Sequence, residues 1–491
     1  MPIQPILNLI EDLPSIASLS LSMPVPLLAS SASAEHAPIV LAGVLLSLVV
    51  IYVASKLGGE LSKLLDLPPV LGELVGGVVV GASVLHLLIL PESGAVASDS
   101  MIMTALQGIG NLSPEVMPDI FASQSEVISV LAELGVIVLL FEIGLESDLR
   151  ELQKVGVQAI AVAVVGVAAP FAAGTIGLMA FFHIAAIPAI FAGAALTATS
   201  IGITSKVLSE LGKLKSREGQ IIVGAAVIDD VLGIIVLAVV AGLAKTGEVD
   251  VLKVGYLIVS ATVFLLGSIL LGRFFNTAFI GIASRLKTRG KLVIPAFVFA
   301  LLMSFLACSL RLEAILGAFA AGLVLDETDK RKELDQQVMP ISDVLVPIFF
   351  VTVGAKAELG VLNPMMPENR EGLIIAGFLV IVAILGKVVT GWAVFGQPGI
   401  NRLAIGVGMI PRGEVGLVFA GIGTASGVLS DPLEAAIIIM VILTTFIAPP
   451  CLRFIFEQDP SEAGAVVFGA SAVESGQGLD GAAISANLAD Q

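Results

Sequence analysis

The sequence divides into long apolar runs separated by short charged loops, and this pattern limits what the chain can fold into. Of its 491 residues, 57% are hydrophobic and 13% are charged, whereas a soluble domain usually carries about 25% charged residues. A hydrocarbon core about 30 Å thick needs about 20 apolar residues in each helix that crosses it. The alternating strands of a transmembrane barrel are missing, so we predict an all-α, polytopic membrane protein.

About thirteen segments are predicted to cross the membrane as helices. Together they form a transmembrane domain over residues 37–456, and the ninth is the shortest. Their approximate ranges are 37–56, 68–90, 127–146, 155–182, 187–211, 218–243, 251–274, 291–311, 313–326, 341–357, 371–395, 401–428 and 432–455.

The basic residues of the loops predict the orientation. With the N-terminus outside, 18 of the 25 Lys and Arg residues fall on the side of the C-terminus, 5 fall on the other side and 2 lie within segments. Positive charge is enriched in cytoplasmic loops. We therefore expect the N-terminus outside or in a lumen and the C-terminus in the cytoplasm, in a prokaryotic plasma membrane or an internal, thylakoid-like membrane.

The two ends of the chain differ from the membrane domain. Residues 1–36 are predicted to be a leader or an interfacial segment, and because they contain no Lys or Arg, the positive region of a signal peptide is missing. Residues 457–491 also lack Lys and Arg and are rich in acids, Gly, Ala and Ser. This composition predicts a disordered acidic tail.

Charge and composition also exclude several classes of protein. The formal net charge is −16 and there is no basic stripe, so no nucleic-acid binding is expected. Cys308 and Cys451 lie in apolar segments and are interpreted as small packing residues, not as a disulfide or metal pair. The three histidines are scattered, and no cofactor is predicted.

Two predicted helices, 187–211 and 401–428, are interrupted near the middle. The first contains Thr and Ser residues that compete with helical hydrogen bonds, and the second contains Pro-Arg-Gly-Glu from Pro411 to Glu414. They occupy matching places if the first six and the last six segments form two inverted repeats. Broken helices at matching places indicate a transporter with its substrate site near the midplane.

Oxygen atoms in the first break are candidate ligands for a transported ion. Thr197, Thr199 and Ser200 supply hydroxyl and carbonyl oxygens there. Irregular backbone at membrane depth is tolerated only inside protein or beside a wet cavity. We therefore predict these three residues as possible ion ligands.

Two adjacent aspartates, Asp229 and Asp230, lie about halfway along the helix predicted at 218–243. A carboxylate at the bilayer centre costs about 3 kcal/mol, so it persists when it is paired, protonated or bound to a cation. Neighbours on a helix point about 100° apart, so one carboxylate can face an ion cavity while the other reaches another helix. Such a carboxylate binds either a proton or a metal ion, and this competition predicts a cation/proton antiporter.

Lys387 is the predicted counter-charge of this pair. It lies near the middle of the segment 371–395, which flanks the second break as the aspartate helix flanks the first. Lysine titrates readily when it is buried. A lysine near a helix end would snorkel to the interface instead, but Lys387 lies too deep for that.

The other membrane charges have less specific interpretations. Arg412 and Glu414 are predicted to neutralise each other and the half-helix ends at the second break, with direct ion binding by Glu414 as the alternative. Glu142 belongs either to an entry funnel or to a helix end, whereas Glu146 and Glu73 are interpreted as structural.

Six short motifs, each at one place in the membrane domain, resemble those of a known family. They are PPVLGE at 68–73, LFEIGLE at 140–146, ALTATS at 195–200, AVIDD at 226–230, GAFAAG at 317–322 and PRGE at 411–414. Together they resemble the monovalent cation:proton antiporter-2 family, and within it the bacterial NapA-type sodium/proton antiporters. The resemblance covers about residues 37 to 455.

This resemblance implies an NhaA/NapA-like fold of inverted repeats with two broken, crossing helices. It also implies a homodimer in the lipid membrane, in which a core domain moves against a dimerisation domain. We expect core helices at about 127–243 and 341–456, and dimerisation helices from about 37–90 and 251–326.

The resemblance further implies roles for the buried charges. Asp230 would be the principal carrier of Na⁺ and H⁺, and Asp229 would pair with Lys387 and contribute to the sodium site. Exchange would be electrogenic, with two protons per sodium ion. Potassium-efflux relatives tend to have Gln-Asp at this motif and to append a soluble nucleotide-binding domain, and the sequence shows neither.

We therefore predict a secondary active transporter, not an enzyme, that exchanges Na⁺ for H⁺ by alternating access and serves pH homeostasis. An electroneutral K⁺/H⁺ antiporter is the alternative, and Li⁺ or K⁺ are alternative cations. A cation channel is more remote, because channels use rings or filters with several weak sites. An intramembrane aspartyl protease would need its aspartates on separate helices, and these are neighbours.

Overall fold

A computed structural model describes residues 31–91, 95–110, 112–246, 250–357, 359–362 and 369–457. Within these ranges all regular structure is helical, as predicted. The predicted leader 1–36 and the acidic tail 457–491 lie almost entirely outside the described residues, so both stay predictions.

The helices follow one another along the chain with short connections. In order they are α2 (Ser31–Leu64), α3 (Pro69–Val80), η3 (Ala97–Asp99), α4 (Met101–Gly110), α5 (Met117–Glu146), α6 (Leu149–Lys154), α7 (Gly156–Phe181), α8 (Ala186–Ala195), α9 (Ile201–Glu210), α10 (Arg217–Thr246), α11 (Val251–Arg285), α12 (Val293–Ser309), α13 (Ala314–Asp326), α14 (Arg331–Ala355), η4 (Leu359–Leu362), α15 (Asn369–Val388), η5 (Val389–Ala393), α16 (Arg402–Gly408), α17 (Glu414–Ala425) and α18 (Asp431–Glu457).

Each of the thirteen predicted segments coincides with a helix or with a broken pair of helices. Eight described helices are long and apolar enough to cross a membrane, and five shorter apolar helices accompany them. The helix predicted at 68–90 ends early, at Val80, because the chain reverses there and the Leu88 amide donates to the Val80 carbonyl at 2.8 Å. Residues 88–90 are apolar and buried in this turn, so their apolar character does not mark a continuation of the helix.

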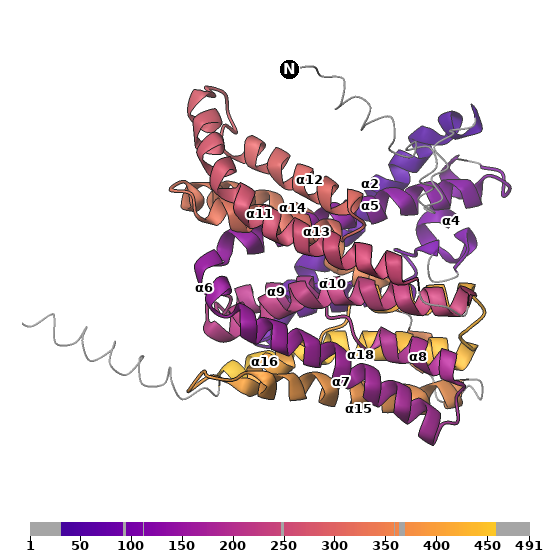
Figure 1. Cartoon of the computed structure of the whole chain (residues 1–491). Coiled ribbons are helices and arrows are strands. Elements are labelled where there is room, and N and C mark those ends of the chain that lie inside the picture. The colour runs from indigo at the N-terminus through magenta and orange to yellow at the C-terminus, as the bar shows by residue number, and fades with distance from the viewer. Residues whose placement is uncertain are drawn as a thin grey trace, which may run out of the picture.

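The helices pack as two bundles, which Figure 1 shows one above the other with α9 and α10 between them. We call α7 to α10 and α15 to α18 the site bundle, and α2, α3, α5 and α11 to α14 the scaffold bundle. One apolar cluster lies wholly within the site bundle, and a larger one fills the scaffold and reaches the α9 side of the site bundle.

The packing of two helices differs from the predicted grouping. α5 and α14 were expected with the core helices, in the ranges 127–243 and 341–456, but they pack most extensively against α13, α3 and each other. Their buried faces belong to the cluster of the scaffold bundle. These two helices pack through glycines and apolar side chains against segments that are distant in the sequence. Their positions along the chain do not reveal these partners. Whether the bundles move and dimerise as predicted stays a proposal.

A pair of glycines sets the close crossing of α5 and α13. A Cβ atom at Gly144 would collide with the Phe319 carbonyl and the Gly322 backbone, and one at Gly322 would collide with the Phe141 carbonyl. Small residues at a helix crossing let the two backbones approach closely, which is a common way for membrane helices to pack.

We predict that Gly322→Leu destabilises the protein, because the added side chain must push α13 away from α5. Overpacking of this kind costs about 1–3 kcal/mol. The midpoint of thermal unfolding in detergent should fall, whereas Gly377→Leu on α15, where an added Cβ meets nothing within 4 Å, should leave it nearly unchanged. Equal midpoints for the two variants would contradict the packing argument.

Candidate functional site

The two predicted breaks are present and they touch each other. One separates α8 from α9 over residues 196–200, and the other separates α16 from α17 over residues 409–413. The Ser200 amide donates to the Pro411 carbonyl at 2.8 Å, and the Thr199 hydroxyl donates to the Met409 carbonyl at 3.3 Å. Both hydrogen bonds join backbone that has left the helices, so the broken helices cross in direct contact as predicted.

Arg412 lies at the centre of this crossing. Its side chain is fully buried, and Nη1 donates to the carbonyls of Thr197, at 3.1 Å, and of Ala198. These carbonyls follow the C-terminal end of α8, where a helix leaves acceptors unsatisfied and carries partial negative charge. The predicted compensation of a half-helix end by Arg412 is therefore present in the geometry.

The backbone of Arg412 is also bound at the crossing, whereas its side chain is hydrogen-bonded only in part. Thr445 of α18 donates to the Arg412 carbonyl at 2.5 Å. Among the described residues, the buried Nε and Nη2 atoms of Arg412 have no hydrogen-bond partner. The side chain of Glu414 lies outside the described residues, so its predicted pairing with Arg412 stays a prediction.

The predicted ion pair between α10 and α15 is present. Lys387 Nζ lies 3.0 Å from Asp229 Oδ2, and both side chains are 0% exposed. Lys387 stands in the last turn of α15, where a helix end favours a cation. Gly166 of α7 leaves the space beside it, because a Cβ atom there would approach Lys387 Nζ to 3.2 Å.

A second contact ties the start of α10 to the second broken helix. Glu218 Oε1 accepts a hydrogen bond from the backbone amide of Asn401 at 3.0 Å, and the Asn401 side chain in turn caps α16. α10 is thus fixed to the site bundle at its beginning by Glu218 and at its middle by Asp229.

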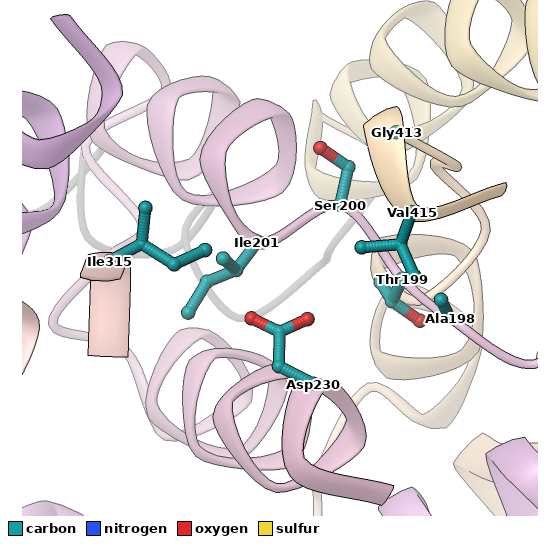
Figure 2. A pocket seen from close by; sticks show the side chains of 8 residues that line it. All are labelled: Ala198, Thr199, Ser200, Ile201, Asp230, Ile315, Gly413 and Val415. Carbon is teal, nitrogen blue, oxygen red and sulfur yellow. The ribbon is translucent and has the colours of Figure 1, made fainter. Parts of the chain in front are cut away.

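Asp230 faces away from the ion pair and lines a pocket (Figure 2). Its side chain is 7% exposed, and its carboxylate points toward the segment that links α8 to α9. The pocket is lined by Ala198, Thr199, Ser200, Ile201, Asp230, Ile315, Gly413 and Val415. The two aspartates therefore divide as predicted from their helical spacing, one toward Lys387 and one toward a cavity.

The predicted ion ligands of the first break are placed differently. Thr199 and Ser200 line the pocket, but the Ser200 hydroxyl points away from Asp230 in Figure 2. The Thr199 hydroxyl keeps lone pairs for a cation after donating to Met409. Thr197 is not among the lining residues, and its hydroxyl donates to the Ala194 carbonyl at 2.7 Å.

Ile315 is a lining residue that sequence reasoning misses. It stands at the start of α13 in the scaffold bundle, whereas the other lining residues belong to the site bundle. An isoleucine in an apolar run carries no signal of this role. Its position shows that the pocket lies where the two bundles meet.

The other three glutamates singled out in the sequence accept hydrogen bonds from serines and do not line this pocket. Glu142 accepts a hydrogen bond from Ser342, and Glu73 accepts one from Ser55 at 2.9 Å. Glu146 accepts one from Ser209 at 2.9 Å. Glu142 is therefore not a first contact of the Asp230 pocket, and its role in a funnel stays a prediction.

Two broken helices that cross beside a buried carboxylate pair, within a bundle of apolar helices, define a secondary transporter. The chain belongs to the sodium/hydrogen exchanger family: residues 41–458 match the family described as sodium/hydrogen exchanger, transmembrane. It is thus an integral, multi-pass membrane protein and a transporter, not an enzyme.

Individual relatives agree with this assignment. The chain is 62% identical to the high-affinity Na⁺/H⁺ antiporter NhaS3 of a Synechocystis species, over 88% of this chain and 94% of the relative. It is 33% identical to the Na⁺/H⁺-K⁺ antiporter GerN of Bacillus cereus, over 83% and 95%. The sodium proton antiporter MjNhaP1 of Methanocaldococcus jannaschii shares the fold, with a TM-score of 0.54 and 16% identity over 87% of this chain and 99% of that one.

We predict that Arg412→Gln destabilises the protein, because the carbonyls after α8 lose a charged donor. Hydrogen bonds to charged groups contribute about 1.5–3 kcal/mol. Thermal unfolding in detergent should shift to lower temperature. Arg402→Gln, at an exposed position on α16, is the control and should unfold near the parent; an unchanged midpoint for Arg412→Gln would show that Arg412 does not support the crossing.

Proposed function

We propose that this protein exchanges Na⁺ for H⁺ across the membrane by alternating access. The observation that carries the proposal is the division of the aspartate pair, with Asp229 bound to Lys387 in a fully buried ion pair and Asp230 lining the pocket at the crossing. Sodium/proton antiport in two relatives of high coverage supports the choice of ions.

Asp230 is the group that alternates between proton and cation. A hard cation takes oxygen ligands, and the pocket offers the Asp230 carboxylate together with the Thr199 hydroxyl. A carboxylate in an apolar surrounding is stable when it is protonated or bound to a cation, but costly when it is bare. Binding one of the two therefore displaces the other, which couples their transport.

Lys387 supplies the second proton of an electrogenic cycle. When Na⁺ enters and attracts Asp229, the ion pair breaks and leaves the lysine ammonium buried without its partner. A buried unpaired charge is expensive, so Lys387 releases its proton. Two protons then move for each Na⁺, and net charge crosses the membrane in each cycle.

The protein would work as a homodimer in the lipid bilayer, with the site bundle moving against the scaffold bundle. The distribution of Lys and Arg favours an external or luminal N-terminus and a cytoplasmic C-terminus. The membrane would be a prokaryotic plasma membrane or an internal, thylakoid-like one.

We predict that Asp230→Asn abolishes exchange while the protein still folds. The amide keeps the shape of the side chain but can neither release a proton nor neutralise a cation. The measurement is Na⁺-induced proton efflux from proteoliposomes, repeated with Li⁺ and K⁺. Asp329→Asn, at an exposed turn, should retain full exchange, and substantial exchange by Asp230→Asn would overturn the role of Asp230.

We predict that Lys387→Gln lowers the voltage dependence of any exchange that survives. Loss of the second proton carrier removes net charge movement, for which about 2.3 kcal/mol per charge is available at 100 mV. Exchange is measured at zero and at imposed membrane potential, with exposed Lys215→Gln as the control. Unchanged voltage dependence in an active Lys387→Gln protein would refute the two-proton cycle.

A further inference from the structure

The packing around α10 differs on the two sides of Asp230. Along α10, residues 219–227, which precede the aspartates, are buried, whereas residues 231–243, which follow Asp230, are mostly half-buried. The covered side is the one on which α9 ends and α10 begins. The contacts at the end of α9 are therefore candidates for what keeps this side closed.

The first turn of α3 lacks a capping side chain of its own. Pro68 occupies the N-cap position without a side-chain hydrogen bond, and Pro69 has no N–H group. The first available amide is that of Val70, and it donates to Glu210 Oε2 at 3.4 Å. A carboxylate at a helix N-terminus is stabilising. Here it comes from the last residue of α9, so a residue of the site bundle caps a helix of the scaffold bundle.

The preceding residue makes a second contact between the bundles. The Ser209 hydroxyl donates to Glu146 Oε2, at the end of α5, over 2.9 Å. Lys206, one turn earlier on α9, and Lys63 and Glu73 of the scaffold bundle act electrostatically on Glu210. Two consecutive residues of α9 thus bind two different scaffold helices within a cluster of charges.

We propose that Ser209 and Glu210 form a latch that holds the pocket closed on the α9 side and parts whenever Asp230 is exposed to that side. The latch rests on the proposed alternating-access function and adds to it the residues that stabilise one of its two states. By the charge distribution this is the cytoplasmic side. Each hydrogen bond of the latch has a carboxylate as its acceptor and stabilises only the closed state. Loss of one bond should therefore raise the fraction of molecules that are open to this side about tenfold.

A reversible crosslink tests whether the latch must open. Cys308 and Cys451 are first replaced by Ser, and Ser209→Cys is combined with Glu146→Cys. A short bifunctional methanethiosulfonate reagent then joins the two thiols, and a reductant releases them. We expect the crosslinked protein to lose sodium/proton exchange in proteoliposomes and the reduced protein to regain it.

A matched pair within one bundle is the control. Gln124 donates a hydrogen bond to the Ser47 hydroxyl at 2.8 Å, and this pair joins α5 and α2 within the scaffold bundle. Crosslinked Ser47→Cys/Gln124→Cys should keep exchanging. Full exchange by the completely crosslinked Ser209/Glu146 protein would overturn the latch, whereas no exchange by the cysteine-free parent would overturn the proposed function instead.

A second measurement tests the hydrogen bond itself. Gly202 lies on the face of α9 toward the scaffold, because an added Cβ would contact Phe349 and Val136. In Gly202→Cys protein without the native cysteines, Ser209→Ala should raise thiol labelling by a charged reagent from the α9 side about tenfold. Ser216→Ala, whose hydroxyl donates to the Lys213 carbonyl and accepts from the Gly219 amide in the first turn of α10, should not change it. Equal labelling in the two variants would show that the bond does not hold the side closed.

Discussion

The ion pair between Lys387 and Asp229 is the interaction on which the arrangement of the site bundle depends. Neither charge can remain in an apolar interior without the other, because a single buried charge costs several kcal/mol. The pair therefore fixes the rotation of α10 against α15, and α7 passes close to Lys387 with a glycine, Gly166. With Asp229 turned toward Lys387, the helix necessarily presents Asp230 to the junction of the two bundles.

The crossing of the broken helices satisfies backbone groups that would otherwise be buried without hydrogen bonds. Unwound backbone leaves acceptors that lipid cannot satisfy, and the two breaks satisfy each other through Ser200 and Pro411 while Arg412 serves the carbonyls after α8. The pocket thus lies between a side-chain charge pair and a backbone crossing.

Much of this arrangement is predictable because burial of charge in a membrane leaves few solutions. The helical segments, both breaks and the partner of Asp229 follow from apolar length, from Pro and Gly, and from the need of each charge for a counter-charge. Sequence does not predict that α5 and α14 pack with the scaffold bundle, that α4 forms, or that Ile315 reaches the pocket. These features depend on contacts between distant segments. Glycines and apolar residues occur in every membrane helix, so the sequence does not show which of them meet.

The anchoring of α10 at two points makes its length part of the site. Glu218 holds the helix start against Asn401, and Asp229 follows three turns later on nearly the same face, offset by about 20°. One inserted or deleted residue between them would turn the pair by about 100° relative to this anchor, so that Asp229 would no longer point at Lys387. Substitutions within these three turns can be absorbed by packing, but a change of register cannot, and related chains should keep this spacing constant.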